Sequence, residues 1–285
     1  MRLLLVGMLS VWLSCATPDA QAENVRKIAE ASMLVKGAVQ ISPDGSVKGY
    51  VLDQAEKLPP AVTELIRKNI PSWKFQFAAT PEAVLNESMS VRVLAKAVDA
   101  QHESVSIIAA TFGDDKGAKD ERIQFKTRRQ PQYPPMAIDA RVSGTVFLLL
   151  RIDRDGRVQD AFAEQVNLRA YGDKWAMDRY RKSLAGAALN AAREWTYDIP
   201  TKGKDADAPY WLVRVPVSFD LHAFGEQQSP ASEYGHWDIY VPGPKQDVPW
   251  VKDRTLLSEA PDAIPDGALH QVGTGPRLAT SLAGS

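Results

Sequence analysis

Two stretches of the sequence, 35–93 and 144–221, predict the same succession of elements: a strand, a tight turn, a second strand, a helix, two aromatic residues and a closing strand. In each stretch an aromatic-x-aromatic triplet begins 18 positions before a Val-Arg-Val triplet (91 − 73 and 213 − 195). This order and spacing favour duplication of one ββαβ unit, although two generic ββαβ units could match by chance. We therefore predict an α+β fold of two ββαβ units, each a small antiparallel sheet packed on a helix.

The second stretch carries the clearer local signals. Apolar residues alternate over 144–152, as expected for a strand, and Gly156 follows in a tight turn, where glycine supplies the positive φ. The segment 157–166 returns as a second strand. Apolar residues then recur at spacings of three and four up to Trp195, which predicts a helix with Asp173 as its N-cap.

The first stretch repeats this pattern with a shorter helical segment. Apolar residues alternate over 35–41, Gly45 lies in the predicted turn, and 47–52 returns. Pro60 is well placed in the first turn of a helix that continues to Ile70.

The N-terminus predicts a cleaved signal peptide, residues 1–22, and hence a periplasmic location. After Arg2 the apolar run is about a dozen residues, short of the ~20 that span a bilayer, and it ends in Ala-Gln-Ala before Glu23. The only cysteine, Cys15, lies within this segment, so disulfides, a thiol nucleophile and a Cys-bound metal are excluded from the mature chain. Lipidation of Cys15 is the alternative, although Trp12 fits a lipoprotein signal poorly.

Composition divides the remaining chain into four parts. We predict a first domain over 23–112, a polar linker over 113–129, a second domain over 130–222 and a largely irregular tail rich in proline and glycine over 223–285.

The second unit resembles the C-terminal domain of the TonB energy transducers. The family pattern is Tyr-Pro, a short helix, Gly-x-Val, a strand, Asp-Gly-x-Val, a helix, an aromatic-x-aromatic triplet and a Val-rich strand. Its parts occur here in order at Tyr133-Pro134, Gly144/Val146, Asp155-Gly156-Arg157-Val158, Trp195-Thr196-Tyr197 and 213–219. The first unit resembles a diverged copy that lacks the Tyr-Pro start.

The resemblance implies binding of a peptide from an outer-membrane receptor. The family captures a short extended peptide beside its last strand, by β-augmentation. Pro216 supports an edge position for that strand, because proline cannot donate to a ladder. Matching positions then give the candidate contacts Gln130, Gln132, Tyr133, Tyr210, Leu212, Arg214, Pro216 and Ser218.

Two other functions remain open. A membrane-anchored transducer requires that the N-terminal segment stay uncleaved, and the long Pro-rich spacer of a transducer is replaced here by the first unit. A structural envelope protein could instead bind peptidoglycan through the same domain. We favour a periplasmic interaction module linked to outer-membrane transport, in contact with the membrane only if the signal is retained.

The sequence gives no sign of catalysis, cofactors or nucleic-acid binding. The four histidines, at positions 102, 222, 236 and 270, show no metal-ligand spacing, and no Gly-x-Ser-x-Gly elbow or phosphate-binding glycine loop occurs. A formal net charge of −1 provides no general attraction for nucleic acid. We therefore predict that the chain is not an enzyme and binds no cofactor or metal.

Overall fold

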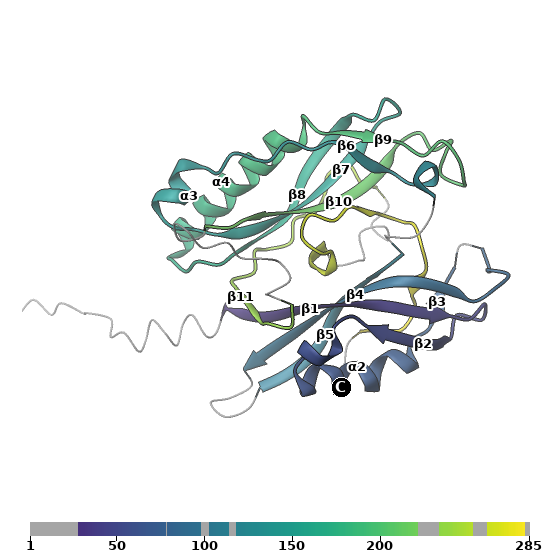
Figure 1. Cartoon of the computed structure of the whole chain (residues 1–285). Coiled ribbons are helices and arrows are strands. Elements are labelled where there is room, and N and C mark those ends of the chain that lie inside the picture. The colour runs from purple at the N-terminus through teal and green to yellow at the C-terminus, as the bar shows by residue number, and fades with distance from the viewer. Residues whose placement is uncertain are drawn as a thin grey trace, which may run out of the picture.

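The computed structural model describes residues 28–77, 79–97, 103–113, 118–221, 234–252 and 261–282 of the 285-residue chain. The predicted signal peptide and the histidines at positions 102 and 222 lie outside these residues. Two antiparallel sheets face each other, a helix covers each outer face, and C-terminal residues run between the sheets (Figure 1). The predicted α+β class with small antiparallel sheets is confirmed.

The first sheet combines the N-terminal half with one strand of the tail. In pairing order its strands are β11 (Asp238–Tyr240), β1 (Glu30–Ile41), β4 (Leu85–Ala97) and β5 (Glu103–Phe112), and β2 (Val47–Leu52) also pairs with β1. The predicted strand 35–41 is part of β1. The sequence analysis missed β5, because this strand follows the last element of the ββαβ order.

The helix α2 (Pro60–Asn69) packs on the first sheet, between the short helical turns η1 (Ala55–Lys57) and η2 (Ile70–Ser72). Val62 and Ile66 are fully buried in the same apolar cluster as the inward-facing residues of β1 and β4. The helix thus covers one face of this sheet, as the apolar spacing predicts.

The second sheet has the strand order β12-β10-β7-β8. Its strands are β7 (Gly144–Ile152), β8 (Val158–Leu168), β10 (Trp211–Phe219) and the two-residue β12 (His270–Gln271). The helices α3 (Pro135–Asp139) and α4 (Lys174–Ala192) contribute to the same apolar core as these strands. The side chain of Asp173 accepts a 2.8 Å hydrogen bond from the Ala176 N–H, so the predicted N-cap is confirmed.

The predicted linker contains structure of its own. After the short turn η3 (Lys119–Glu121), β6 (Gln124–Thr127) pairs with β9 (Thr196–Asp198). Phe125 meets the ring of Trp195 edge-on, with 5.7 Å between ring centroids. The polar composition that suggested a linker did not reveal this strand, because it forms through a partner distant in the sequence.

The turns of the two predicted units are built alike. Gly45 has φ +80° and accepts a 2.8 Å hydrogen bond from the Phe75 N–H, and Gly156 has φ +73° and accepts one of 2.8 Å from the Tyr197 N–H. A Cβ at either glycine would lie 2.2 or 2.1 Å from the carbonyl oxygen of that same aromatic residue. Positive φ and close backbone approach both require glycine at these positions.

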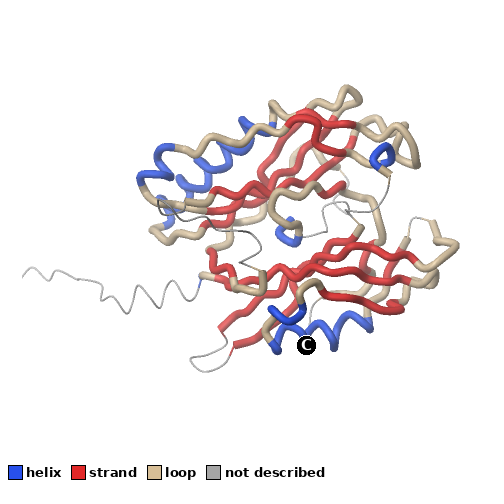
Figure 2. Tube along the Cα trace, viewed as in Figure 1, coloured by secondary structure: helices blue, strands red, loops and turns tan. Residues whose placement is uncertain are grey.

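The tail is mostly loop but pairs with both sheets (Figure 2). β11 extends the first sheet beside β1, while Val241, the next residue, exchanges backbone hydrogen bonds of 3.1 and 2.8 Å with Leu168 of β8. Farther on, β12 joins the second sheet, and β13 (Arg277–Leu278) pairs with β3 (Phe75–Gln76). The tail therefore ties the two sheets together.

Candidate functional site

The strand β10 presents its residues alternately to two faces. Trp211, Val213, Val215, Val217 and Phe219 belong to the core beneath α4. The predicted contacts Leu212, Arg214, Pro216 and Ser218 share the opposite face, toward the space between the sheets. Four of the predicted contact residues therefore lie on one face of β10, as the two-residue period of a strand requires.

The expectation of an open edge at β10 needs a correction. β12 pairs antiparallel with this edge at Val213 and Arg214, and the Val272 N–H donates a 2.9 Å hydrogen bond to the Leu212 carbonyl. An unpaired strand edge offers N–H and C=O groups to any strand that reaches it, and here the chain's own tail reaches it. The sequence could not show this, because β12 is only two residues long.

Pro216 faces the same edge as Leu212. In an antiparallel strand the backbone groups of every second residue point the same way. The Leu212 carbonyl points to β12, so the nitrogen of Pro216 also points away from β7. The missing N–H therefore costs the β10–β7 ladder nothing, which explains how proline is accommodated here.

Arg214 forms an ion pair that closes off its side chain. Its guanidinium donates hydrogen bonds of 2.8 and 3.1 Å to the two carboxylate oxygens of Glu164 on β8. The side chains are only 1% and 0% exposed. Leu149, Leu212 and the tail residues Val248 and Val272 form a small apolar cluster on the same face. Arg214 is thus not presented to an incoming peptide in this state.

The other candidates lie at the two ends of β10. Tyr210, just before the strand, is 44% exposed and lies beneath the Arg151 guanidinium. At the far end the Tyr133 ring meets Phe219 edge-on at 5.4 Å, and its hydroxyl donates a 2.7 Å hydrogen bond to the Val142 carbonyl. Burial raises the pKa of the Tyr133 hydroxyl. Gln130 and Gln132 are exposed beside it in sequence.

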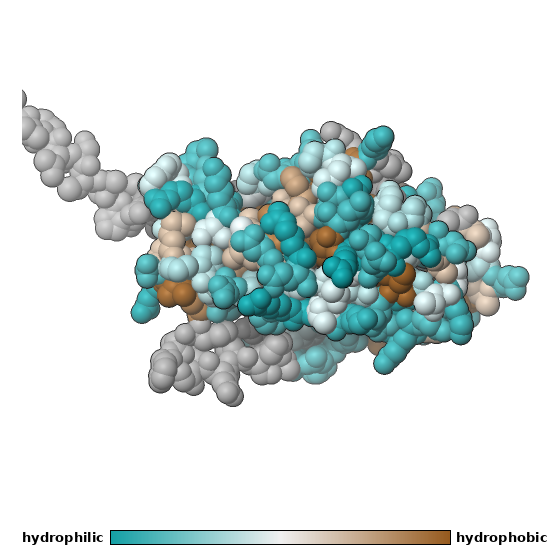
Figure 3. All heavy atoms as spheres, turned by 90° about the horizontal axis from the view of Figure 1, so that it is seen from above, coloured by the Kyte–Doolittle hydropathy of each residue, from teal (hydrophilic) through white to brown (hydrophobic). Residues whose placement is uncertain are grey.

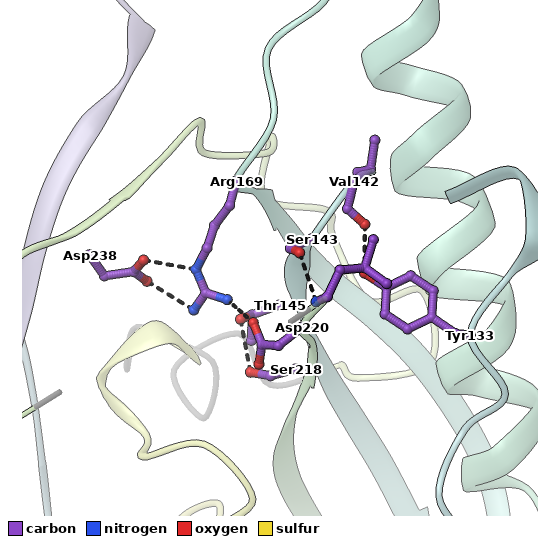
Figure 4. A network of polar contacts seen from close by, with 9 residues as sticks. Tyr133, Val142, Ser143, Thr145, Arg169, Ser218, Asp220 and Asp238 are labelled. Carbon is purple, nitrogen blue, oxygen red and sulfur yellow. Dashed lines mark hydrogen bonds and ion pairs between the residues drawn. The ribbon is translucent and has the colours of Figure 1, made fainter. Parts of the chain in front are cut away.

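A polar network joins the end of β10 to the tail (Figure 4). Arg169 donates hydrogen bonds of 2.8 and 3.2 Å to the Asp238 carboxylate and also pairs with Asp220. The hydroxyls of Thr145 and Ser218 are 3.1 Å apart, within hydrogen-bond distance. Arg169 thus links the second sheet, through Asp220, to the strand β11.

A cavity of about 800 Å³ opens between the sheets next to this network. Pro216, Ser218 and Phe147 contribute the wall from the second sheet, Met33 belongs to β1, and Trp237 comes from the tail. Nearby, partial desolvation raises the pKa of Asp266, an exposed residue whose carboxylate contacts the Ser218 hydroxyl. The part of β10 that does not pair with β12 therefore borders space of mixed polarity.

Within the described ranges, no group of three or more His, Cys, Asp or Glu side chains is placed to hold a metal ion. None of the helices described has the length and apolar character to cross a bilayer. The face on the side of the second sheet is mostly hydrophilic, with small separate hydrophobic areas (Figure 3). The exposed apolar side chains near α3 and α4 are Ile138, Tyr171 and Trp175.

Sequence reasoning missed Glu164, Arg169 and Asp266. Each is an ordinary charged residue in its local sequence, and only the register of β8 with its neighbours, or the path of the tail, brings it to β10. An acidic residue in a strand that otherwise reads as half-buried is the one signal that could have pointed to Glu164.

Comparison with known proteins finds similarity to TonB proteins. No protein-family model matches the chain. Over 100 residues the chain is 32% identical to Protein TonB of Xanthomonas campestris pv. campestris strain B100, and equally to Protein TonB of a second strain of that pathovar. The matched stretch is 35% of this chain and 39% of each relative, so the chain spans less than half the length of these relatives. The similarity supports the presence of a TonB-like domain in this chain.

Proposed function

We propose that this chain is a TonB-like interaction protein of the cell envelope that binds an extended peptide of an outer-membrane receptor, or of another envelope protein, beside β10. The observation that carries the proposal is the pairing of β10 with a short strand on its outer edge, through backbone hydrogen bonds. β12 pairs only with Val213 and Arg214, so the edge continues past it through Pro216 and Ser218. A longer extended peptide could follow that edge into the cavity.

The similarity to Protein TonB supports a role linked to outer-membrane transport. The location proposed is the periplasm, after cleavage before Glu23. N-terminal sequencing of the protein from cells tests this: a chain that retains Met1 would favour the anchored transducer.

The two units are proposed to be copies of one ancestral ββαβ domain, over 23–112 and 130–222, joined by 113–129 and followed by the tail 223–285. The identical hydrogen bonding of Gly45 to Phe75 and of Gly156 to Tyr197 supports this. A turn fixed in the same way against an aromatic-x-aromatic triplet is a more specific likeness than strand order alone.

Binding is tested with fluorescent synthetic peptides of receptor plug segments, titrated with the chain and followed by anisotropy. Ser218→Pro removes an N–H that points outward on the part of β10 that does not pair with β12, and it should weaken binding at least ten-fold. Ser218→Ala keeps that N–H and is the matched control for the loss of the hydroxyl contacts with Thr145 and Asp266. Equal affinity of the proline variant and the wild type would exclude pairing at this edge.

Peptidoglycan binding is the second candidate, through the exposed residues Gln130, Gln132 and Tyr210. Co-sedimentation with purified sacculi distinguishes it, because peptide capture alone predicts that the protein stays in the supernatant.

A further inference from the structure

The C-terminal segment 261–272 lies between the sheets and ends on the edge of β10 (Figure 1). It begins with the short helical turn η6 (Pro261–Ala263) and ends at β12 and Val272. We propose that this segment is an internal occupant of the β10 edge, and that a strand from a partner pairs fully with β10 only after the segment leaves. The inference rests on the proposed function and adds a regulatory step to it.

A partner strand and β12 need the same backbone groups, since the Leu212 carbonyl already accepts the Val272 N–H at 2.9 Å and Arg214 lies opposite His270. Two strands cannot pair with one edge at the same residues. Any peptide whose pairing extends across Leu212 to Arg214 must therefore displace β12.

The segment also packs beside side chains of β10. Arg214 is 1% and Leu212 is 7% exposed, and Val272 belongs to the apolar cluster that contains Leu212. Both residues are matched to peptide-contact positions by the resemblance. Val272 of the segment thus packs in the cluster with the Leu212 side chain, beside the backbone groups that a partner would use.

Side-chain hydrogen bonds from other parts of the chain hold the segment in place. The Arg92 guanidinium donates to the Asp262 carbonyl, the Thr111 hydroxyl lies 3.4 Å from the Ala263 carbonyl, and Arg128 donates a 2.8 Å hydrogen bond to the Gly267 carbonyl. Arg92 and Thr111 belong to the first sheet, on β4 and β5. The first unit therefore helps to hold the segment that occupies the edge of the second.

The short pairing makes the segment replaceable. β12 is a two-residue strand, whereas β7 pairs with β10 along all nine of its residues. Local opening is expected where few backbone hydrogen bonds hold a segment. The edge of β10 should thus open toward the tail far more readily than toward β7.

Hydrogen–deuterium exchange of the full chain tests this without any ligand. The amide hydrogen of Val272 should exchange at least ten-fold faster than those of Val213 and Val215, which face β7. Equal protection of the three amides would show that the tail is as fixed as the core strands, and would overturn the inference.

A reversible disulfide tests the competition itself. Leu212 and Val272 are members of one apolar cluster on neighbouring strands, so Leu212→Cys with Val272→Cys, in a chain carrying Cys15→Ser, can join the tail to β10. Labelled receptor plug peptides are titrated before and after reduction. We expect at least ten-fold weaker binding to the oxidised than to the reduced form of the same protein.

The control is Val272→Cys alone, again with Cys15→Ser, whose binding should not respond to oxidation. Equal binding by the oxidised and reduced double variant would overturn the internal occupant but leave the proposed function standing. Binding by neither form would count against the proposed function, and amide exchange would then decide the inference separately.

Discussion

Glu164 and Arg214 form a two-pronged ion pair, with hydrogen bonds of 2.8 and 3.1 Å, whose side chains are almost completely removed from solvent. The pair joins β8 to β10 across β7, on the face where the tail packs. Taking two charges out of water is costly, and their mutual attraction compensates only while both are present. Each of the two side chains therefore needs the other, and the ion pair forms only when β8 and β10 lie in their native positions on either side of β7.

Removal of one partner should be strongly destabilising. Arg214→Met leaves the Glu164 carboxylate buried without its guanidinium and should lower the free energy of unfolding by about 3–5 kcal/mol. The double variant with Glu164→Leu should recover most of that loss. Urea denaturation of the single and double variants measures both effects.

The control is an exposed ion pair with a similar nitrogen–oxygen distance. Arg129 and Glu194 are joined at 2.8 Å, but their side chains are 66% and 58% exposed. Solvent screens such a pair, so Arg129→Met should cost less than about 1 kcal/mol. A loss at Arg214 no larger than at Arg129 would mean that the buried carboxylate is relieved by another group.

Local patterns predicted the elements that local chemistry determines. The strand predicted over 144–152 is β7, and the turn predicted at Gly156 joins β7 to β8. The N-cap predicted at Asp173 begins α4. In these cases the side-chain period and the capping group act within a few residues of each other, so the sequence alone contains the information.

Pairing between distant segments escaped prediction. β6 and β12 are short and polar, and they become strands only because β9 and β10 offer them an edge. The same holds for the candidate site: Pro216 correctly indicated an outward edge, but the occupant of that edge lies more than fifty residues later in the chain. Short strands carry too few residues for a period to be recognised.

The Tyr197 hydroxyl gives a second prediction. It is buried without a hydrogen-bond partner among the described residues, and burial raises its pKa. On folding, a buried hydroxyl without a partner loses its hydrogen bonds to water and forms none within the protein. Tyr197→Phe should therefore raise the free energy of unfolding by about 1 kcal/mol. Thermal and urea denaturation measure the change.

Tyr133 is the matched comparison, because its hydroxyl donates a 2.7 Å hydrogen bond to the Val142 carbonyl. Tyr133→Phe should therefore lower stability by about 1 kcal/mol while the ring keeps its contact with Phe219. Losses of equal size for the two variants would show that the Tyr197 hydroxyl has a partner after all.

The turn glycines give a third prediction. Alanine at Gly156 would hold φ at +73° and place its Cβ 2.1 Å from the Tyr197 carbonyl, so it should lower stability by at least about 2 kcal/mol. Gly45→Ala should cost a similar amount, since its Cβ would lie 2.2 Å from the Phe75 carbonyl. Gly186→Ala is the control, because that helical glycine has nothing within 4 Å of an added Cβ and should gain about 0.5–1 kcal/mol.

The fourth prediction concerns pH. Asp266 remains exposed to solvent, but partial desolvation by the surrounding chain raises its pKa above the ordinary value of 3.8. Asp220 raises this pKa further, whereas the Ser218 hydroxyl and Arg128 oppose the shift. The folded chain therefore holds this proton more tightly than the unfolded chain does. Its contribution to stability is complete below pH 3.8 and is lost as the pH rises through the folded-state pKa. Asp266→Asn removes the titrating group and with it this loss. As the pH rises from 3.8 through the folded-state pKa of Asp266, the free energy of unfolding of the wild type should therefore fall relative to that of the variant.

The pKa of Asp44 is shifted in the opposite direction, so Asp44 serves as the control. Its exposed carboxylate accepts hydrogen bonds from the Ser46 hydroxyl and N–H, at 2.6 and 3.0 Å, and these hold its pKa below 3.8. Its contribution is present above pH 3.8 and is lost as the pH falls through the folded-state pKa. Urea denaturation from pH 3 to 7 should therefore separate Asp266→Asn from Asp44→Asn by the direction of the pH dependence that each removes. If Asp266→Asn left the wild-type profile unchanged, the surroundings of Asp266 would not raise the pKa of its carboxyl group in solution.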